Sequence, residues 1–145
     1  MSVEIKGLDS LIKKLGTVEG AVQQGLYRGI GKTMTVIEGD AKDLCPVDTG
    51  ELRNSIHSKT EIKGDTISGE VGTSKTYAGF IEMGTGQRGS SSPSPPKAPI
   101  GDGYREDWTG IPAQPYLYPA LMQNKETANE LCTQELQKEL NKLGR

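Results

Sequence analysis

A run of apolar residues at helical spacing, ended by a proline, constrains the fold of this chain more than any other feature. Between residues 17 and 44 apolar side chains recur every three or four positions, at Val18, Val22, Leu26, Ile30, Met34, Ile37, Ala41 and Leu44. This is the period of an amphipathic helix. Pro46 lacks the N–H that a helix needs and disfavours helical angles at Cys45. The pattern predicts one long helix that ends just before residue 46.

Glycines inside this predicted helix indicate what must hold it together. They are Gly25, Gly29, Gly31 and Gly39. Each glycine costs about 1 kcal/mol relative to alanine in a helix interior, so packing must supply the stability. Gly25 and Gly29 share one face, where missing side chains would let another backbone approach closely. A kinked or poorly optimised helix is an equally good interpretation. The pattern also allows a shorter helix at residues 8–15.

The segment after Pro46 predicts a short helical turn followed by a β-hairpin. Asp48 and Glu51 have the spacing of a capping box, with Asp replacing the usual Ser or Thr, which favours a helical turn through Leu52 and Arg53. Residues 56–62 and 67–71 alternate in polarity on either side of a turn at 63–65. One face is sparsely apolar, so we expect the sheet to be half exposed or covered by a neighbour.

The second half of the chain predicts a long loop and a final helix. Residues 77–83 (YAGFIEM) are too short an apolar run to distinguish a strand from a helical turn. Residues 87–113 contain GSSSPSPPKAP, which cannot bury enough apolar surface to order itself, so a flexible loop is predicted. Pro119 suits the first turn of the last helix. Its apolar stripe is Leu121, Ala128, Leu131, Leu136, Leu140 and Leu143, and its basic end is Lys138, Lys142 and Arg145.

These elements predict an α+β fold, with a long N-terminal helix and a C-terminal helix packed on a small, mainly antiparallel β-sheet. The 145 residues have the length of a single domain, 1–145, in which 87–113 is the extended loop. Hydrophobic residues make up only 33% of the chain, beside 19 glycines and 8 prolines. Such a lean core suggests help from neighbouring subunits.

Charge and composition argue against several classes of function. The formal net charge is -2, so the chain lacks the basic excess of a nucleic-acid-binding protein. No apolar run approaches the ~18 residues that span a bilayer, and the N-terminus lacks a signal region, so we expect a cytosolic product and no membrane partner. Cys45 and Cys132 lie outside any CxxC spacing, which predicts two free thiols.

The sequence offers little catalytic or metal-binding chemistry. His57 is the only histidine, and no ligand-spaced cluster surrounds it, so neither a metal nor another cofactor is expected. A Cys45 nucleophile with His57 as its base is conceivable, but an exposed strand histidine fits the alternating pattern better. The glycine-containing segments GTSKTYAG and GTGQRGSS match neither phosphate-binding pattern and are interpreted as turns.

Three blocks in a fixed order carry a family resemblance. They are CPVDTGELRNSI at 45–56, VGTSKTYAGFIEMGTG at 71–86 and QPYLYPAL at 114–121. Together they resemble small phage tail-component proteins, also described as tail-completion or head-tail joining (neck) proteins, of lambdoid and related siphophages and prophages. The matching positions are Pro46, Asp48, Thr49, Gly50, Leu52, Arg53, Ser55, Tyr77, Ala78, Glu82, Gly84, Thr85, Pro115, Leu117, Pro119 and Ala120, with Tyr116 where the family commonly has Phe.

Physical reasoning assigns these positions structural roles. Pro46 and Gly50 would fix a turn that Asp48 and Thr49 cap. The three blocks would converge at one end of the sheet. Arg53 and Glu82 could then form a surface ion pair, which would contribute only about 0 to 1 kcal/mol.

The resemblance implies virion assembly rather than catalysis. It predicts a homo-oligomeric ring subunit whose partners are other neck or tail proteins, such as a connector, stopper, tail terminator or tail tube, with DNA passing through the ring without specific recognition. Tyr104 and Trp108 are candidate partner contacts in the long loop. The rival hypotheses are a small hydrolase-like enzyme around His57 and a phage DNA-binding adaptor with a basic lumen.

Overall fold

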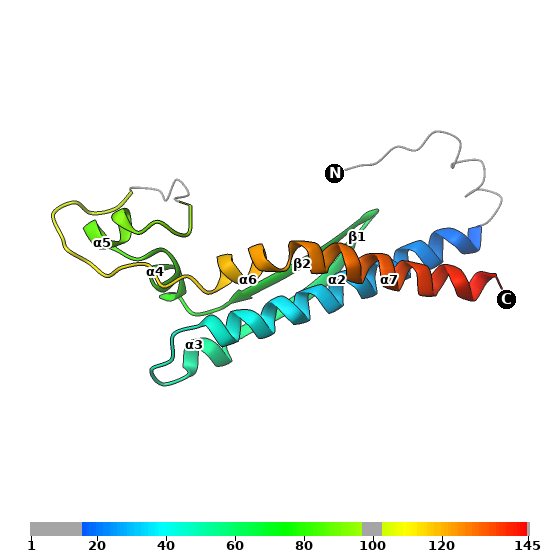
Figure 1. Cartoon of the computed structure of the whole chain (residues 1–145), viewed down its shortest axis with the longest axis horizontal. Helices are drawn as coiled ribbons and strands as arrows, with labels where there is room; N and C mark the ends of the chain where they lie inside the picture. The colour runs from blue at the N-terminus through cyan, green and yellow to red at the C-terminus, as the bar shows by residue number, and fades with distance from the viewer. Residues whose placement is uncertain (1–15, 97–102, 145) are drawn as a thin grey trace.

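The computed structural model describes residues 16–96 and 103–144. Its elements are α2 (Gly16–Leu44), α3 (Glu51–Asn54), β1 (Ile56–Lys63), β2 (Thr66–Thr73), α4 (Ala78–Met83), α5 (Gly86–Ser91), α6 (Leu117–Gln123) and α7 (Lys125–Leu143). In Figure 1, α2 and α7 run side by side, the hairpin lies along α2, and α4 and α5 occupy one end. The predicted α+β class is confirmed. The possible helix at 8–15 and Arg145 lie outside the described residues.

The long helix predicted from the apolar period is α2, and its most buried face repeats every four residues. That face consists of Gly25, Gly29, Thr33, Ile37 and Ala41, continued by Cys45 just after the helix. The Thr33 hydroxyl donates to the Gly29 carbonyl at 2.8 Å, so a polar side chain is accommodated inside the packed face. The second half of this face enters the hydrophobic core, whereas the first half packs on α7.

The two glycines of this face resolve the alternative left open by the sequence. A Cβ atom on Gly25 would lie 2.8 Å from the Leu136 Cα of α7, and one on Gly29 would lie 2.6 Å from the Cys132 Cα. These separations are too short for a real side-chain carbon. Gly25 and Gly29 therefore permit a backbone-to-backbone approach of α2 and α7, rather than marking a poorly optimised helix.

The predicted hairpin is the antiparallel pair β1–β2, with Gly64 and Asp65 between the strands and Gly64 at a φ of +59°. The side chains of β2 alternate between the two faces of the sheet, as predicted, and Gly69 lies on the face toward α2. A Cβ at Gly69 would meet the side chains of Ile30 and Met34, so α2 covers one face of the sheet.

The C-terminal region forms two helices, where the sequence predicted one. The division falls at Asn124, whose backbone N–H donates to the Leu121 carbonyl at 3.3 Å. The buried Asn124 side-chain amide donates to Asp40 Oδ2 at 2.6 Å and to the Ala120 carbonyl at 2.8 Å. This amide ties the junction of α6 and α7 to α2. Pro119 does lie in the first turn of α6, as predicted.

The apolar stripe predicted for the last helix is wrong at both ends. Leu121 lies in α6 and is 50% exposed, and the C-terminal half of the stripe is exposed as well. Leu140 and Leu143 are 38% and 44% exposed, whereas Glu135 and Glu139 are buried. The reason is the close approach at Gly25 and Gly29, which leaves no room for large aliphatic side chains between α2 and α7. Carboxylates can take such positions because cations on the rims of the helix pair reach them.

The short helices also correct the sequence-based expectations. Residues 78–83 form helix α4, and residues 86–91 at the start of the predicted loop form helix α5. The predicted helical turn is α3, but Asp48 does not cap it. Its N-cap position is Gly50, at a φ of +83°, and Thr49 Oγ1 accepts from the Glu51 N–H at 3.4 Å.

Candidate partner-binding surfaces

The three sequence blocks meet at one end of the sheet and build most of the core. Leu52 and Ile56 come from the first block, Ala78 from the second, and Tyr116 and Ala120 from the third. Their buried side chains pack with Cys45, which also belongs to the first block, and with Ile37 and Ala41 of α2. Most of the motif therefore supports the fold, and its exposed members are the ones available to partners.

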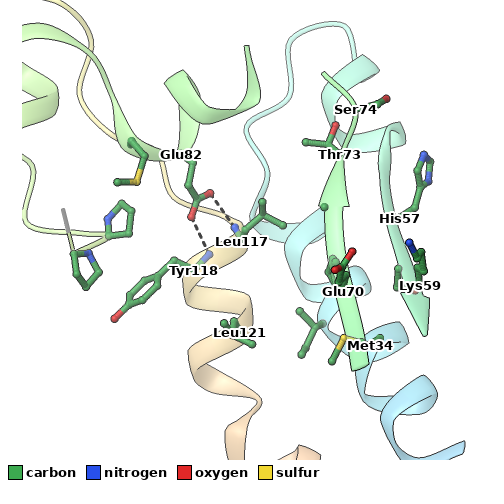
Figure 2. Close-up of a pocket in the computed structure, with 18 residues that line it drawn as sticks. Met34, His57, Lys59, Glu70, Thr73, Ser74, Glu82, Leu117, Tyr118 and Leu121 are labelled. Carbon is green, nitrogen blue, oxygen red and sulfur yellow. Dashed lines mark hydrogen bonds between the residues drawn. The ribbon is translucent and has the colours of Figure 1, made fainter. Parts of the chain in front are cut away.

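Glu82 is the central polar residue of this cluster. Its carboxylate is buried and accepts three backbone N–H groups at the start of α6, from Tyr116 at 2.8 Å, Leu117 at 3.0 Å and Tyr118 at 2.8 Å. Figure 2 shows the carboxylate pointing down onto α6. A carboxylate here satisfies orphan donors and complements the positive end of the helix. The predicted surface ion pair of Glu82 with Arg53 is wrong, because Glu82 is an internal cap.

The remaining block residues divide between turns and surface. Asp48, Thr49, Arg53 and Tyr77 are exposed; Pro46, Gly50, Ser55, Thr85, Pro115, Leu117 and Pro119 are half-buried; Gly84 is buried. The Ser55 hydroxyl hydrogen-bonds the Thr73 hydroxyl at 2.5 Å, which links α3 to the end of β2. A cavity of about 320 Å³ lies between residues 46–50 and Tyr77. The structure thus brings the first two blocks together around a small surface hollow.

Glycines in the second block let two chain segments cross. Gly84 has a φ of +72°, and a Cβ atom there would lie 2.6 Å from the backbone nitrogen of Ala113. The crossing is tied by Thr85 N–H donating to the Ile111 carbonyl at 2.9 Å and Gln87 N–H donating to the Trp108 carbonyl at 2.9 Å. The GTG segment is therefore more than a turn, and the two described ends of the 87–113 loop are attached to the rest of the molecule.

The two candidate loop residues have different environments. Tyr104 is half-buried, and its hydroxyl donates to the Met83 carbonyl at 3.1 Å, so it anchors the loop to α4. Trp108 is 51% exposed and lines a hollow of about 410 Å³ together with Phe80, which is 60% exposed. We call Phe80 and Trp108 the aromatic surface. Phe80 was not among the contacts predicted from the sequence, although an aromatic residue in an apolar run too short to bury it is a signal that could have indicated it.

A second hollow runs between β2 and α6. It is a groove of about 1070 Å³. Its apolar lining includes Met34, Ile37, Val71, Leu117 and Leu121. In Figure 2, Leu117 and Leu121 of α6 face β2 across this space, whereas His57 and Lys59 project from the far side of the hairpin. We call it the β2 groove.

Paired charges line the contact of α2 with α7. Lys32 lies 2.5 Å from Glu135 and Arg28 lies 2.7 Å from Glu139. Lys138 and Lys142 bind the same two carboxylates from within α7, each at 2.8 Å. Hydrogen bonds from Lys138 and Lys32 lower the pKa of Glu135 to about 2. These basic side chains are engaged within the protein.

The described residues contain no group of three or more His, Cys, Asp or Glu placed to hold a metal ion. Cys45 is buried, and desolvation raises the pKa of its thiol, which opposes formation of a nucleophilic thiolate. His57 is exposed on β1, as the alternation predicted. Both cysteines are free. No helix in the described ranges is long and apolar enough to cross a bilayer.

The fold and these surfaces define a small α+β protein whose distinctive exposed features are the aromatic surface and the apolar β2 groove. Residues 9–84 match the HK97-gp10-like family model, described as "Bacteriophage HK97-gp10, putative tail-component". The chain belongs to this family of phage tail components. The match includes the first block and most of the second, while the third block lies outside it. Searches of curated proteins and of solved structures found no match.

Proposed function

We propose that the chain is a non-enzymatic subunit of the phage neck or tail, which forms a homo-oligomeric ring at the head-tail junction and completes the virion. The observation that carries the proposal is the aromatic surface on a chain of the tail-component family. Phe80 and Trp108 expose most of their large apolar side chains beside a hollow, and such residues dominate the energy of protein interfaces.

A ring suits this molecule because head-to-tail contacts repeated around an axis bury surfaces that one subunit leaves open. The partners would be a connector, a stopper, a tail terminator or the tail tube, and DNA would pass through without sequence-specific contacts. The paired cations of α2 and α7 favour this function over a DNA-binding adaptor, because buried carboxylates already engage them.

Deletion of the gene followed by complementation tests the proposal. We expect the deletion strain to accumulate filled heads and separate tails, visible by electron microscopy, and wild-type protein to restore joined particles. Normal virions in the deletion strain would show that the role at the junction is wrong.

Variants test the aromatic surface separately. A Phe80→Ala/Trp108→Ala protein should fold, as judged by circular dichroism, and fail to restore joining. Ile62→Ala is the matched control, because Ile62 is 44% exposed beside the hairpin turn. Full joining by the double variant would exclude the aromatic surface as the partner contact.

A further inference from the structure

The two edges of the sheet differ in how they are covered. The described sheet has two strands, so each strand has one outer edge. At the β1 edge, Glu38 of α2 accepts the Ser58 N–H at 2.7 Å and also binds Lys42 at 2.6 Å. The β2 edge faces the β2 groove. An open edge above an apolar groove is the arrangement that accepts an added strand.

The pairing register shows which β2 groups face outward. The Ser58 N–H points away from β2, toward Glu38, and Ser58 lies opposite Val71. In an antiparallel pair such a couple is not hydrogen-bonded, so the N–H and C=O of Val71 point away from β1. The backbone N–H and C=O groups of every second residue of β2, including Gly69 and Thr73, point away from β1 in the same way. The groove therefore offers a row of backbone donors and acceptors above the side chains of Met34 and Ile37.

The N-terminal sequence has the composition that this groove requires. In residues 2–6 (SVEIK), apolar Val3 and Ile5 alternate with charged Glu4 and Lys6, the pattern of a strand with one buried face. Set antiparallel to β2 with Ile5 opposite Val71, this segment directs Val3 and Ile5 toward α2. The same register sets Lys6 opposite Glu70, an opposite-charge pair.

The chain is long enough to make this connection. Ser58, which lies opposite Val71, donates its N–H to Glu38 of α2, and Glu38 is 22 residues after Gly16, about 33 Å along the helix. If extended, the eleven residue steps from Ile5 to Gly16 would span up to about 36–40 Å, so the connection requires residues 8–15 to be extended rather than the short helix that the sequence also allows. A strand antiparallel to β2 is parallel to β1, so α2 would serve as the crossover helix of a βαβ unit.

We propose that residues 2–6 dock in the β2 groove of their own chain as a third strand, antiparallel to β2, with Ile5 opposite Val71. The strand covers the apolar floor between β2 and α6 and supplies partners for the outward-facing backbone groups of β2. The proposal does not depend on the identity of the neighbouring tail proteins.

Disulfide trapping in the full-length chain tests the proposal. Ile5→Cys with Val71→Cys should form a 5–71 disulfide on mild oxidation, because directly opposed residues have Cα atoms within disulfide range. Glu4→Cys with Val71→Cys is the matched control, because the side chain of residue 4 points to the other face. Peptide mapping separates these bonds from any that involve Cys45 or Cys132. We expect the 5–71 bond within single chains, with a yield independent of dilution.

A 5–71 yield no higher than that of the 4–71 control would overturn the proposal, as would a bond found only between two chains. Hydrogen exchange gives a readout without cysteines. Ile5→Asp should speed exchange of the Gly69 and Val71 amides about tenfold, while Glu4→Gln leaves it unchanged. Equal exchange in the wild type and both variants would also refute the third strand.

Discussion

At the scale of single residues, two buried polar groups have opposite consequences. Glu82 is fully engaged, with three backbone donors at the start of α6. The Tyr116 hydroxyl is buried with no hydrogen-bond partner, although its ring fills the core. Burial raises the pKa of Tyr116 to about 12, so the side chain stays protonated at physiological pH. The Glu82 carboxylate therefore stabilises the fold, whereas the unpaired Tyr116 hydroxyl reduces its stability.

Replacing Glu82 should destabilise the protein strongly. We expect Glu82→Ala to lower the free energy of unfolding by about 2–4 kcal/mol, because it leaves buried N–H groups without an acceptor. Glu82→Gln should cost less, since the amide oxygen can still accept. Urea denaturation measures both. Glu51→Ala is the control, because its ion pair with Lys75 is exposed and should be worth about 0–1 kcal/mol. Equal effects of Glu82→Ala and Glu51→Ala would contradict the capping role.

Removing the Tyr116 hydroxyl should do no harm. We expect Tyr116→Phe to leave the stability unchanged or raise it by up to about 1 kcal/mol, because the substitution deletes an unpaired buried polar atom and keeps the ring. Thermal unfolding provides the measurement. A clear loss of stability would mean that the hydroxyl has a partner in solution.

At the scale of elements, the contact between α2 and α7 depends on missing side chains. We expect Gly29→Ala to lower the unfolding free energy by about 1–3 kcal/mol, because the new methyl group would collide with the backbone at Cys132. Gly39→Ala is the matched control within the same helix. A Cβ atom at Gly39 meets nothing within 4 Å, so that variant should gain about 0.5–1 kcal/mol from helix propensity. Stabilisation by both variants would argue against close packing at Gly29.

Sequence periodicity was sufficient for the elements whose pattern is local. The helix α2 and the hairpin follow from alternations among residues close in the chain, and both were predicted nearly to their bounds. The role of Glu82 could not be predicted in this way, because its partners lie 34–36 residues further along. The buried face of α7 was mispredicted for a similar reason. Glycines on α2, not leucines on α7, decide which side chains fit there.

At the scale of the whole molecule, the core is small and local. The buried hydrophobic side chains of the described residues gather where the three blocks meet α2. Away from this end, polar and small residues mediate the contact between α2 and α7. The lean core expected from composition is therefore concentrated beside the aromatic surface, so the segment that carries Phe80 is attached to the best-packed part of the protein.

This distribution of apolar surface predicts weak self-association of the isolated subunit. Outside the aromatic surface, exposed large apolar side chains are spread over several elements, such as Tyr27 on α2, Ile62 on β1 and Leu143 on α7. Specific stable interfaces bury about 1,200–2,000 Å² with a contiguous apolar centre, which scattered residues do not supply. A ring would then close only when a neck or tail partner binds several subunits at once and stabilises their contacts by mass action. We expect light scattering to show a monomer or a weak oligomer at micromolar concentration, and larger assemblies to appear on addition of purified tails. A stable ring in the absence of any partner would contradict this order of assembly.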